Sequence, residues 1–310
     1  MIGSVLEGYD PAGDYCEMLR SDVTRAIRER LGGMSIEALR RRAADAETEL
    51  YNLGITFTVY SDKEAIDRIL PFDVIPRVIS PEDWQRIESG VVQRVSALNL
   101  LLADIYHDQK ILRDRVLPAD LILNHSCYRP AMRRLDPPHG TYVHICGTDI
   151  VRDQNGTLLV LEDNARTPSG VSYVIENRNL MQRAFPDLLK GIALRPVENY
   201  GLMLAAALAE VAPAACETPC IVLLSPGIYN SAYFEHVFLA REMGVPLVEG
   251  RDLFEADDHV YMRTTGGPSR VDVIYRRIDD DFLDPEAFRP DSMLGVPGII
   301  IIILFLVGVG

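Results

Sequence analysis

A pair of extended segments joined by a tight turn constrains this chain more than any other stretch. The sequence predicts strands over 142–152 and 157–161, with a Gln-Asn-Gly turn between them. Two strands joined in this way form a β-hairpin, which brings the outer ends of its strands together. We therefore expect Asp149 and Glu162 to face one point in space.

Oxygen-bearing side chains gather at that point. Alternation along a strand puts Glu162 and Asn164 on one side and Asp163 on the other. Mg²⁺ takes near-octahedral oxygen ligands, usually one or two carboxylates together with phosphate oxygens of a nucleotide. Asp149, Glu162 and Asn164 are therefore candidate magnesium ligands. The alternative is a solvated acidic turn after a strand, which is common in proteins.

Arginines and a small-residue turn follow these acids. Arg166 and Arg178 each offer the planar guanidinium fork that suits a phosphate or a carboxylate. The alternative for either arginine is a surface ion pair. Ser169 and Gly170 belong to a Pro-Ser-Gly turn, whose backbone amides are candidates for holding an anion.

The charge balance excludes one class of partner. The chain has 31 lysines and arginines against 45 aspartates and glutamates, and its net charge is −14. A nucleic-acid surface needs a basic stripe, so we expect no nucleic-acid partner. Only Lys63, Lys110 and Lys190 are lysines. This scarcity matters because many ATP sites use lysine as a point charge on phosphate.

The cysteines and the N-terminus favour a cytoplasmic protein. Five cysteines in 310 residues show no disulfide-framework pattern, and Cys216 and Cys220 have no nearby Cys or His to complete a zinc set. The first 18 residues have no basic region followed by an apolar core, so no signal peptide is apparent. The apolar run Ile299–Val307 is too short to cross a bilayer, which takes about 20 residues. We expect no membrane association.

Helical and extended patterns alternate along the rest of the chain. Helices are expected over 21–31, 35–50, 80–106, 172–184, 199–211 and 232–243, and further strands over 55–60, 220–224, 245–248, 260–263 and 271–276. We expect the 80–106 helix to be a core helix and the very apolar 199–211 helix to be buried. A strand, a small-residue loop, a helix and a strand over 220–248 predict a Rossmann-like half unit with a parallel sheet.

Other polar features give weaker signals. The loop around Gly227 lacks the GxGxxG pattern of dinucleotide sites, so a structural turn is favoured. His125, His144 and His236 show no triad pattern for nucleophilic hydrolysis. The acidic run 279–284 is expected to be a solvated turn, with a cation or substrate site as the alternative.

Five ordered stretches resemble the circularly permuted ATP-grasp family. They are VYSDKEAIDRILPFDVIPRVI, WQRIESGVVQRVSALNLLLADIY, GTDIVRDQNGTLLVLEDNARTPSGVSYVIENR, LLSPGIYNSAYFEHVFLAREMGVPLVEGRDL and VIYRRIDDDFLDP. The resemblance runs from about residue 20 to residue 298, and the pattern is more distantly similar to glutathionylspermidine synthetase. It implies a mixed α/β fold, with an ATP-grasp-like region carrying the metal-site hairpin over 1–213 and a Rossmann-like pre-ATP-grasp unit over 214–298.

The resemblance also implies a chemistry, namely ATP-dependent ligation of a carboxylate to an amine through an acyl phosphate. The implied partners are ATP, Mg²⁺ and small-molecule or peptide carboxylate and amine substrates. By this resemblance, Glu162 and Asn164 fall on the Mg²⁺ ligands of the family signature, and Asp149 on the other acidic ligand. Arg166 and Arg178 would lie near the phosphates or the acyl substrate.

The pattern departs from the family at its C-terminal end. Family members continue past a segment like DSMLGVPG, whereas here the chain passes into the apolar tail 299–310. We therefore expect an incomplete nucleotide pocket and weak or absent ligase activity in this chain. The alternative is a truncated, non-catalytic fragment that acts as a binding or interaction module.

Overall fold

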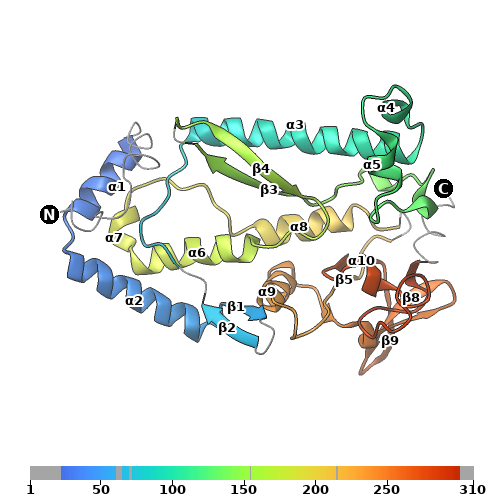
Figure 1. The fold of residues 1–310 in the computed structure, drawn as a ribbon. Coiled ribbons are helices and arrows are strands. Elements are labelled where there is room, and N and C mark those ends of the chain that lie inside the picture. Colours follow the sequence, from blue (N-terminus) through green and yellow to red (C-terminus); the bar gives the residue numbers. More distant parts are fainter. Residues whose placement is uncertain (1–21, 61–64, 70–71, 154, 214–215, 301–310) are drawn as a thin grey trace.

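The fold is a mixed α/β arrangement, as the sequence predicts. The computed structural model describes residues 22–60, 65–69, 72–153, 155–213 and 216–300. A long helix lies along one edge of the molecule with the hairpin beneath it, and a compact unit of strands and helices forms the C-terminal part (Figure 1). The apolar tail 301–310 and the expected boundary at 214–215 lie outside the described residues.

The elements follow the predicted order closely. The helices are α1 (Asp22–Gly32), α2 (Ile36–Asn52), α3 (Pro81–Tyr106), α4 (Lys110–Arg113), α5 (Ala119–Leu123), α6 (Val171–Ala184), α7 (Pro186–Leu189), α8 (Tyr200–Ala209), α9 (Tyr233–Met243) and α10 (Asp280–Leu283). The strands are β1 (Thr56–Tyr60), β2 (Ala65–Ile69), β3 (Gly147–Arg152), β4 (Leu158–Asn164), β5 (Ile221–Leu224), β6 (Leu247–Val248), β7 (Leu253–Ala256), β8 (His259–Thr264), β9 (Gly267–Val271) and β10 (Val273–Arg276).

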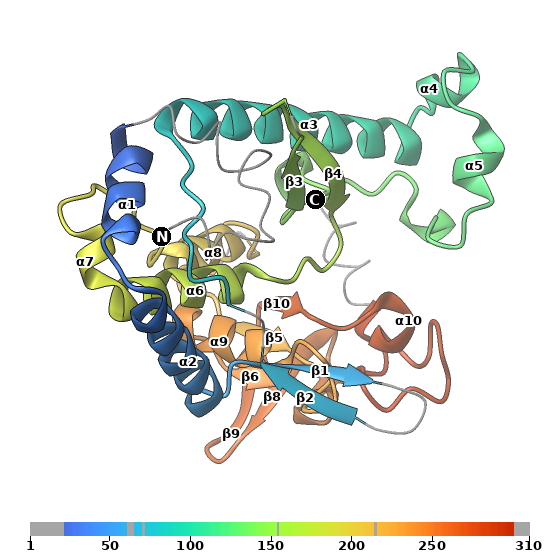
Figure 2. The ribbon, with the colours of Figure 1, turned by 60° about the vertical axis from the view of Figure 1, so that its left-hand side comes forward.

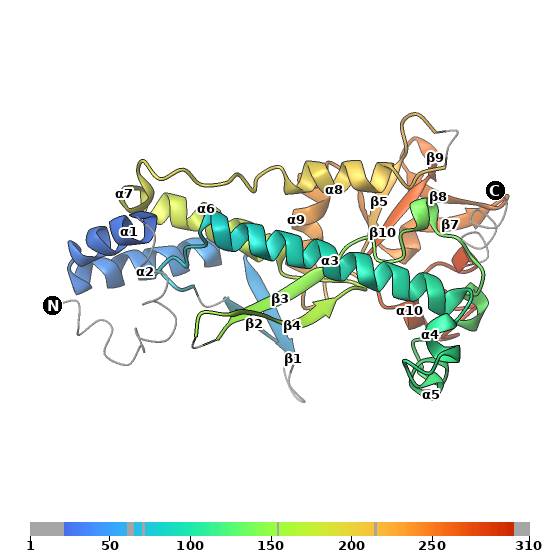
Figure 3. The same ribbon diagram turned by 90° about the horizontal axis from the view of Figure 1, so that it is seen from above.

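Serine caps begin two of the predicted helices. The Ser35 hydroxyl accepts a hydrogen bond from the Ala38 amide at the start of α2, and Ser80 accepts one from the Asp83 amide at the start of α3, each at 3.1 Å. The expectation that α3 is a core helix is wrong, because Ile105 is its only buried residue. Figure 3 shows α3 running lengthwise in roughly the same direction as α6 and α8, over the hairpin.

Helix α8 corrects a second expectation. It buries one face through Gly201, Leu204 and Leu208, while Leu202 and Met203 are 68% and 63% exposed. An apolar sequence on every side therefore does not mean burial on every side here. On the buried face α8 approaches α9 so closely that a Cβ at Gly201 would lie 2.5 Å from the Cβ of Glu242.

The predicted parallel sheet is present in the C-terminal unit. Its strand order is β10-β5-β6, and both pairings are parallel. All four residues of β5 are buried, because Ile221 and Leu223 pack with α8 and α9 while Val222 and Leu224 pack on the other side. Such two-sided burial is typical of parallel strands.

An antiparallel sheet of order β7-β8-β9 covers that other side. Strands β2, β7 and β9 were not predicted, since each is short and partly polar in sequence. The acidic run 279–284, which was expected to be a turn, contains the short helix α10. Ile299, the first residue of the apolar run, is 1% exposed and packs in the core below this sheet.

Figure 2 separates the two parts that frame the candidate site. The hairpin β3–β4 lies against α3 on one side, and the parallel sheet with α9 and α10 lies on the other. The chain that leaves β4 runs from the first part into the second and enters α6. The residues of this connection, 165–170, therefore join the two parts directly.

Candidate functional site

The hairpin brings the predicted metal ligands onto one face. Asp149 lies directly opposite Glu162 in the antiparallel register, and Gly147 lies opposite Asn164. Residues directly opposite each other in such a pair share a face, as do alternate residues of one strand. Asp149, Glu162 and Asn164 are all exposed, and the Asn164 Nδ2 donates to Glu162 Oε1 at 3.1 Å. The three oxygen-bearing side chains therefore share one open face.

Strand β4 is longer than predicted, and this changes how the acids are held. It continues through Asn164, so Glu162 and Asn164 lie within the paired strand and not after its end. The register shifts between Asp149 and Ile150, which leaves Leu161 without a paired residue opposite it. Bulges of this kind increase local twist and are common beside functional sites.

The adjacent acid, Asp163, faces the other way. Its carboxylate forms an ion pair with Arg94 of α3 and accepts a hydrogen bond from the Thr148 hydroxyl at 3.0 Å. The hydrogen bonds from Arg94 lower the pKa of the Asp163 carboxyl, and burial opposes this effect. A second ion pair, between Arg152 of β3 and Asp83 of α3 at 2.8 Å, fixes the same face of the hairpin to the helix.

The donor chemistry of the open face fits a magnesium ion that is also held by phosphate. Two carboxylates and one amide oxygen are hard oxygen ligands, and Mg²⁺ usually takes one or two carboxylates besides nucleotide phosphates. Within the described ranges, no three His, Cys, Asp or Glu side chains form a metal site by themselves. A cation here would therefore need further oxygen ligands from a bound group or from water.

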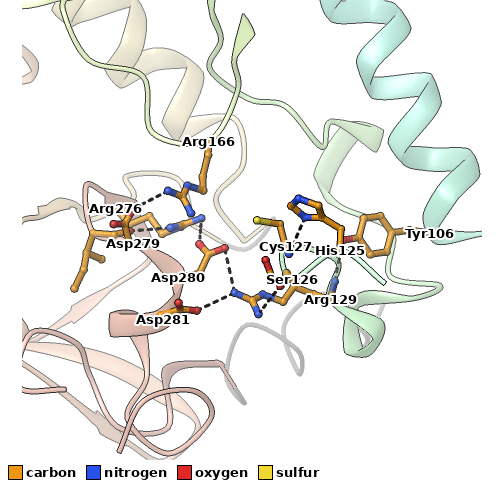
Figure 4. A network of polar contacts seen from close by, with 11 residues as sticks. Tyr106, His125, Ser126, Cys127, Arg129, Arg166, Arg276, Asp279, Asp280 and Asp281 are labelled. Carbon is orange, nitrogen blue, oxygen red and sulfur yellow. Dashed lines mark hydrogen bonds and ion pairs between the residues drawn. The ribbon is translucent and has the colours of Figure 1, made fainter. Parts of the chain in front are cut away.

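Arg166 ties the connection after β4 to the C-terminal unit. Its Nη2 lies 2.9 Å from Asp279 Oδ1, just beyond the end of β10 (Figure 4). The two side chains are 53% and 57% exposed, so the pair contributes little to stability. The pair links the segment after β4 to the segment after β10.

The acidic run at 279–284 is only in part the solvated turn that the sequence suggests, because Asp279 and Asp281 are 57% and 71% exposed but the run contains the helix α10. Asp280 pairs with Arg276 at 2.6 Å, and Asp281 pairs with Arg129 at 3.1 Å (Figure 4). Asp284 is 1% exposed and accepts hydrogen bonds from backbone amides at 286, 298 and 300. These carboxylates are thus engaged in holding segments together around α10.

The remaining predicted residues lie in different surroundings. Arg178 donates to the Arg195 carbonyl at 3.2 Å, so its described hydrogen bond points to the segment before α8 and not to the hairpin face. The Gly170 amide donates to Glu235 Oε2 at 2.7 Å. Ser169 lines a pocket in the C-terminal unit. The roles assigned to these residues stay predictions.

A buried polar cluster below that pocket was not predicted. Glu235 of α9 is fully buried, and its Oε1 lies 2.8 Å from Nη2 of Arg277. Its Oε2 accepts from the Gly170 amide and from the amide and hydroxyl of Ser172, at 2.7–3.2 Å. Arg277 also donates to the Pro168 carbonyl. The cluster therefore fixes the end of the 165–170 connection to α9 and to the end of β10.

Ser225 and His236 form a second buried pair beside this cluster. The Ser225 Oγ lies 2.9 Å from Nδ1 of His236, and it also accepts from the Gly227 amide at 3.1 Å. Burial lowers the pKa of His236 to about 3, and the charge of Arg277 makes a smaller contribution in the same direction. The ring is neutral at pH 7. Gly227 has φ of +95°, a left-handed conformation that suits glycine.

A pocket of about 210 Å³ opens above both pairs. It lies at the carboxyl ends of β5 and β10. Its lining includes Thr167 and Ser169 from the connection, Asn230 and His236 from the β5–α9 region, and Arg277 and Asp279 from the end of β10. The sequence drew attention to His236 but did not predict that it lines a pocket. The signal that points to it is a Glu-His pair embedded in the apolar α9 sequence FEHVFLA, where polar side chains need buried partners.

Comparisons with known proteins identify the class to which this fold belongs. A family model described as "A circularly permuted ATPgrasp" matches residues 76–303. The chain belongs to the circularly permuted ATP-grasp family.

Its relatives are longer than this chain. An uncharacterized protein from Synechocystis is 48% identical over 300 residues, which are 95% of this chain and 62% of the relative. An uncharacterized protein from Mycobacterium tuberculosis is 48% identical over 288 residues, which are 93% of this chain and 49% of the relative. The chain thus spans about half to three fifths of these curated relatives.

One solved structure matches most of this chain. It is a glutathione synthetase-like effector from Globodera pallida in its apo form, with a TM-score of 0.49 and 15% sequence identity, and the match covers 87% of this chain and 64% of that one. Among the described residues, no helix combines the length and apolar character that a membrane span requires.

Proposed function

We propose that this chain carries the magnesium and nucleotide face of an ATP-dependent carboxylate–amine ligase. In this reaction a carboxylate oxygen attacks the terminal phosphorus of ATP, which releases ADP and gives an acyl phosphate. An amine nitrogen then attacks the acyl carbon, loses a proton and expels phosphate, and an amide results. Family membership supports the general chemistry, and the hairpin face supports the assignment of its residues.

One observation carries this proposal. Of three consecutive residues of β4, Glu162 and Asn164 lie on the same exposed face of the hairpin as Asp149, while Asp163 lies on the other face and pairs with Arg94. A flexible turn would leave these side chains free to point anywhere, whereas the paired strand holds the three oxygen-bearing side chains on one face. The open face also presents Val151 and Leu159, which are 42% and 47% exposed and suit an apolar contact with a nucleotide base.

The proposed roles are positional and electrostatic. Bound Mg²⁺ would neutralise charge on phosphate oxygens, with Asp149, Glu162 and Asn164 as its protein ligands. Arg166 would hold the connection beside this face through Asp279. Phosphoryl transfer of this kind needs charge stabilisation and positioning rather than a side-chain nucleophile.

The test compares neighbouring residues of one strand. Thermal unfolding of the 310-residue chain would be followed with increasing Mg²⁺-ATP for wild type, Glu162→Ala and Asp163→Asn. At 100 times its Kd a ligand stabilises the folded state by about 2.7 kcal/mol, which raises Tm by several degrees. We expect the shift in wild type and Asp163→Asn, and its loss in Glu162→Ala.

Two results would contradict the site. They are an absent shift in wild type, or an equal shift in Glu162→Ala. The chemistry has a separate readout, namely ADP release and trapping of the acyl phosphate by hydroxylamine with candidate carboxylates. Mg²⁺-ATP binding without a hydroxamate product would fit a chain that binds the nucleotide but does not complete the ligation.

A further inference from the structure

The pocket above His236 and Arg277 occupies a favourable place in the parallel sheet. In the order β10-β5-β6, the chain leaves β5 through α9 toward β6, while β10 pairs on the opposite edge of β5. Neighbouring strands whose connections diverge leave a crevice outside their carboxyl ends, where open α/β sheets bind ligands. We call this cavity the β5–β10 pocket.

Arg277, whose side chain lines the pocket, has an unused hydrogen-bond donor. Its side chain is 2% exposed, and its two terminal nitrogens bond to Glu235, to the Pro168 carbonyl and to the Tyr275 hydroxyl. Its Nε is buried without a hydrogen-bond partner among the described residues. A buried donor of a charged group without a partner is costly. A ligand that accepts a hydrogen bond there would remove that cost.

His236 supplies a second donor at the same pocket. The Ser225 hydroxyl is fully buried and already accepts from the Gly227 amide, so its proton needs an acceptor, and Nδ1 of His236 lies 2.9 Å away. The hydroxyl therefore donates to Nδ1, and we assign the ring proton to Nε2. Since Ser225 engages Nδ1, Nε2 is the ring donor left for the pocket that His236 lines, although the residue is 1% exposed.

We propose that the β5–β10 pocket binds a carboxylate group of a substrate through Nε2 of His236 and Nε of Arg277. Two N–H donors on buried side chains that line one pocket suit the two oxygens of a carboxylate, because hydrogen bonds to a charged acceptor are strong. The hydroxyls of Thr167 and Ser169 and the side-chain amide of Asn230 line the pocket as additional polar groups.

The charges around the pocket favour a single carboxylate over the other common groups. Glu235 balances the charge of Arg277, and Asp279 at the rim adds a negative charge that Arg166 balances. A phosphate dianion would therefore meet a pocket without net positive charge. An ammonium group would meet two N–H donors. A neutral amide would give up the stronger hydrogen bonds that a charged acceptor makes with N–H groups.

Size and position indicate how this carboxylate relates to the reaction. A volume of about 210 Å³ is room for an amino-acid-sized group. Asn164 and Thr167 are three residues apart, so at most about 11 Å of extended chain separates the hairpin face from the pocket. The pocket would hold a non-reacting carboxylate of a substrate whose other end reaches the phosphate, and this assignment to the substrate rests on the proposed function.

Isosteric probes test the binding directly. Acetate and acetamide have nearly the same shape but differ in charge, and methylammonium carries the opposite charge. Each would be titrated into the full chain at constant ionic strength, with chloride as the compensating anion, while the histidine ring signals are followed by NMR. The His236 signals are identified by their absence in His236→Asn. We expect acetate alone to shift them saturably.

Two substitutions examine the two donors separately. Arg277→Lys keeps a positive charge beside Glu235 but removes Nε, and His236→Asn keeps an acceptor for Ser225 but removes Nε2. Each substitution should weaken acetate binding by about tenfold or more. In His236→Asn, where the ring signal is lost, acetate binding is measured by calorimetry. Should Arg277→Lys fail to fold, His236→Asn still tests the site. Glu162→Ala on the hairpin face should bind acetate as wild type does.

The outcomes separate this inference from the proposed function. An acetate response matched by acetamide, by methylammonium or by chloride would overturn the carboxylate site, as would unchanged affinity in both pocket variants. Loss of the Mg²⁺-ATP effect alone would remove the ligase assignment and leave the carboxylate site standing. Loss of the acetate effect alone would remove the site and leave the nucleotide face standing.

Discussion

Acidification from pH 7 to pH 5 should destabilise this protein through His236, and one substitution should remove that effect. Burial, aided by the charge of Arg277, lowers the pKa of this ring to about 3. A histidine in the unfolded chain has a pKa of about 6.5. As the pH falls below about 6.5, the unfolded state therefore binds a proton that the folded state does not. The free energy of unfolding then decreases with decreasing pH, down to the folded-state pKa.

The magnitude follows from the unfolded-state titration. Between pH 7 and pH 5 the folded ring stays neutral, so the loss reflects protonation of the unfolded chain alone and amounts to about 2 kcal/mol. This value would change little if the folded-state pKa were 4, because pH 5 still lies above it. Over the full window from about pH 6.5 to about pH 3, the loss would approach 5 kcal/mol at 1.36 kcal/mol for each pKa unit.

Urea unfolding at pH 7 and pH 5 measures this difference. His236→Asn keeps a hydrogen-bond acceptor for Ser225 but carries no titrating group, so its stability should fall by about 2 kcal/mol less than that of wild type over the same interval. His144→Asn is the matched control, because His144 is exposed. Equal losses in wild type and His236→Asn would refute the argument that a buried neutral histidine causes the pH dependence.

Substitutions at three further positions test the contacts that support the site, each measured as a change in the urea midpoint. Gly201→Ala should lower the free energy of unfolding by about 1–3 kcal/mol, because its Cβ would lie 2.5 Å from Glu242. Gly90→Ala in α3 meets nothing within 4 Å and should stabilise by about 0.5–1 kcal/mol, so equal signs for the two glycines would contradict the packing. Asn99 Oδ1 accepts hydrogen bonds from the backbone amides at 142 and 143, at 2.7 and 2.9 Å. Asn99→Ala should therefore lower the free energy of unfolding by about 1–3 kcal/mol for each amide that loses its acceptor, whereas Asn99→Asp keeps the acceptor.

The hairpin was predictable because its information is local. A turn of Gln, Asn and Gly fixes which segments pair, and the alternation of side chains fixes which face each acid occupies. The opposite placement of Glu162 and Asp163 follows from these two rules, and the structure has it. The bulge at Leu161 was not predictable, since no local rule places an unpaired residue inside an otherwise regular strand.

The buried cluster was not predictable because its partners are distant in sequence. Glu235 contacts Gly170 and Ser172, which are 65 and 63 residues away, and Arg277, which is 42 residues away. Only the folded arrangement of β10, α9 and the connection brings these groups together. The burial of α3 and α8 was overestimated for a related reason, since apolar composition does not state which faces other elements cover.

The 165–170 connection links these two kinds of information. At one end it continues from Glu162 and Asn164, whose position depends on the local hairpin, and at the other it is held by Glu235 and Arg277, whose position depends on the C-terminal fold. Close packing reinforces this arrangement, because a Cβ at Gly147 would lie 2.9 Å from the Cβ of Pro168. Since both ends of a short segment are fixed, the hairpin face and the β5–β10 pocket keep a set separation. The ligase reaction that we propose would use that fixed separation to present a substrate to a nucleotide, because positioning supplies much of the rate of such reactions.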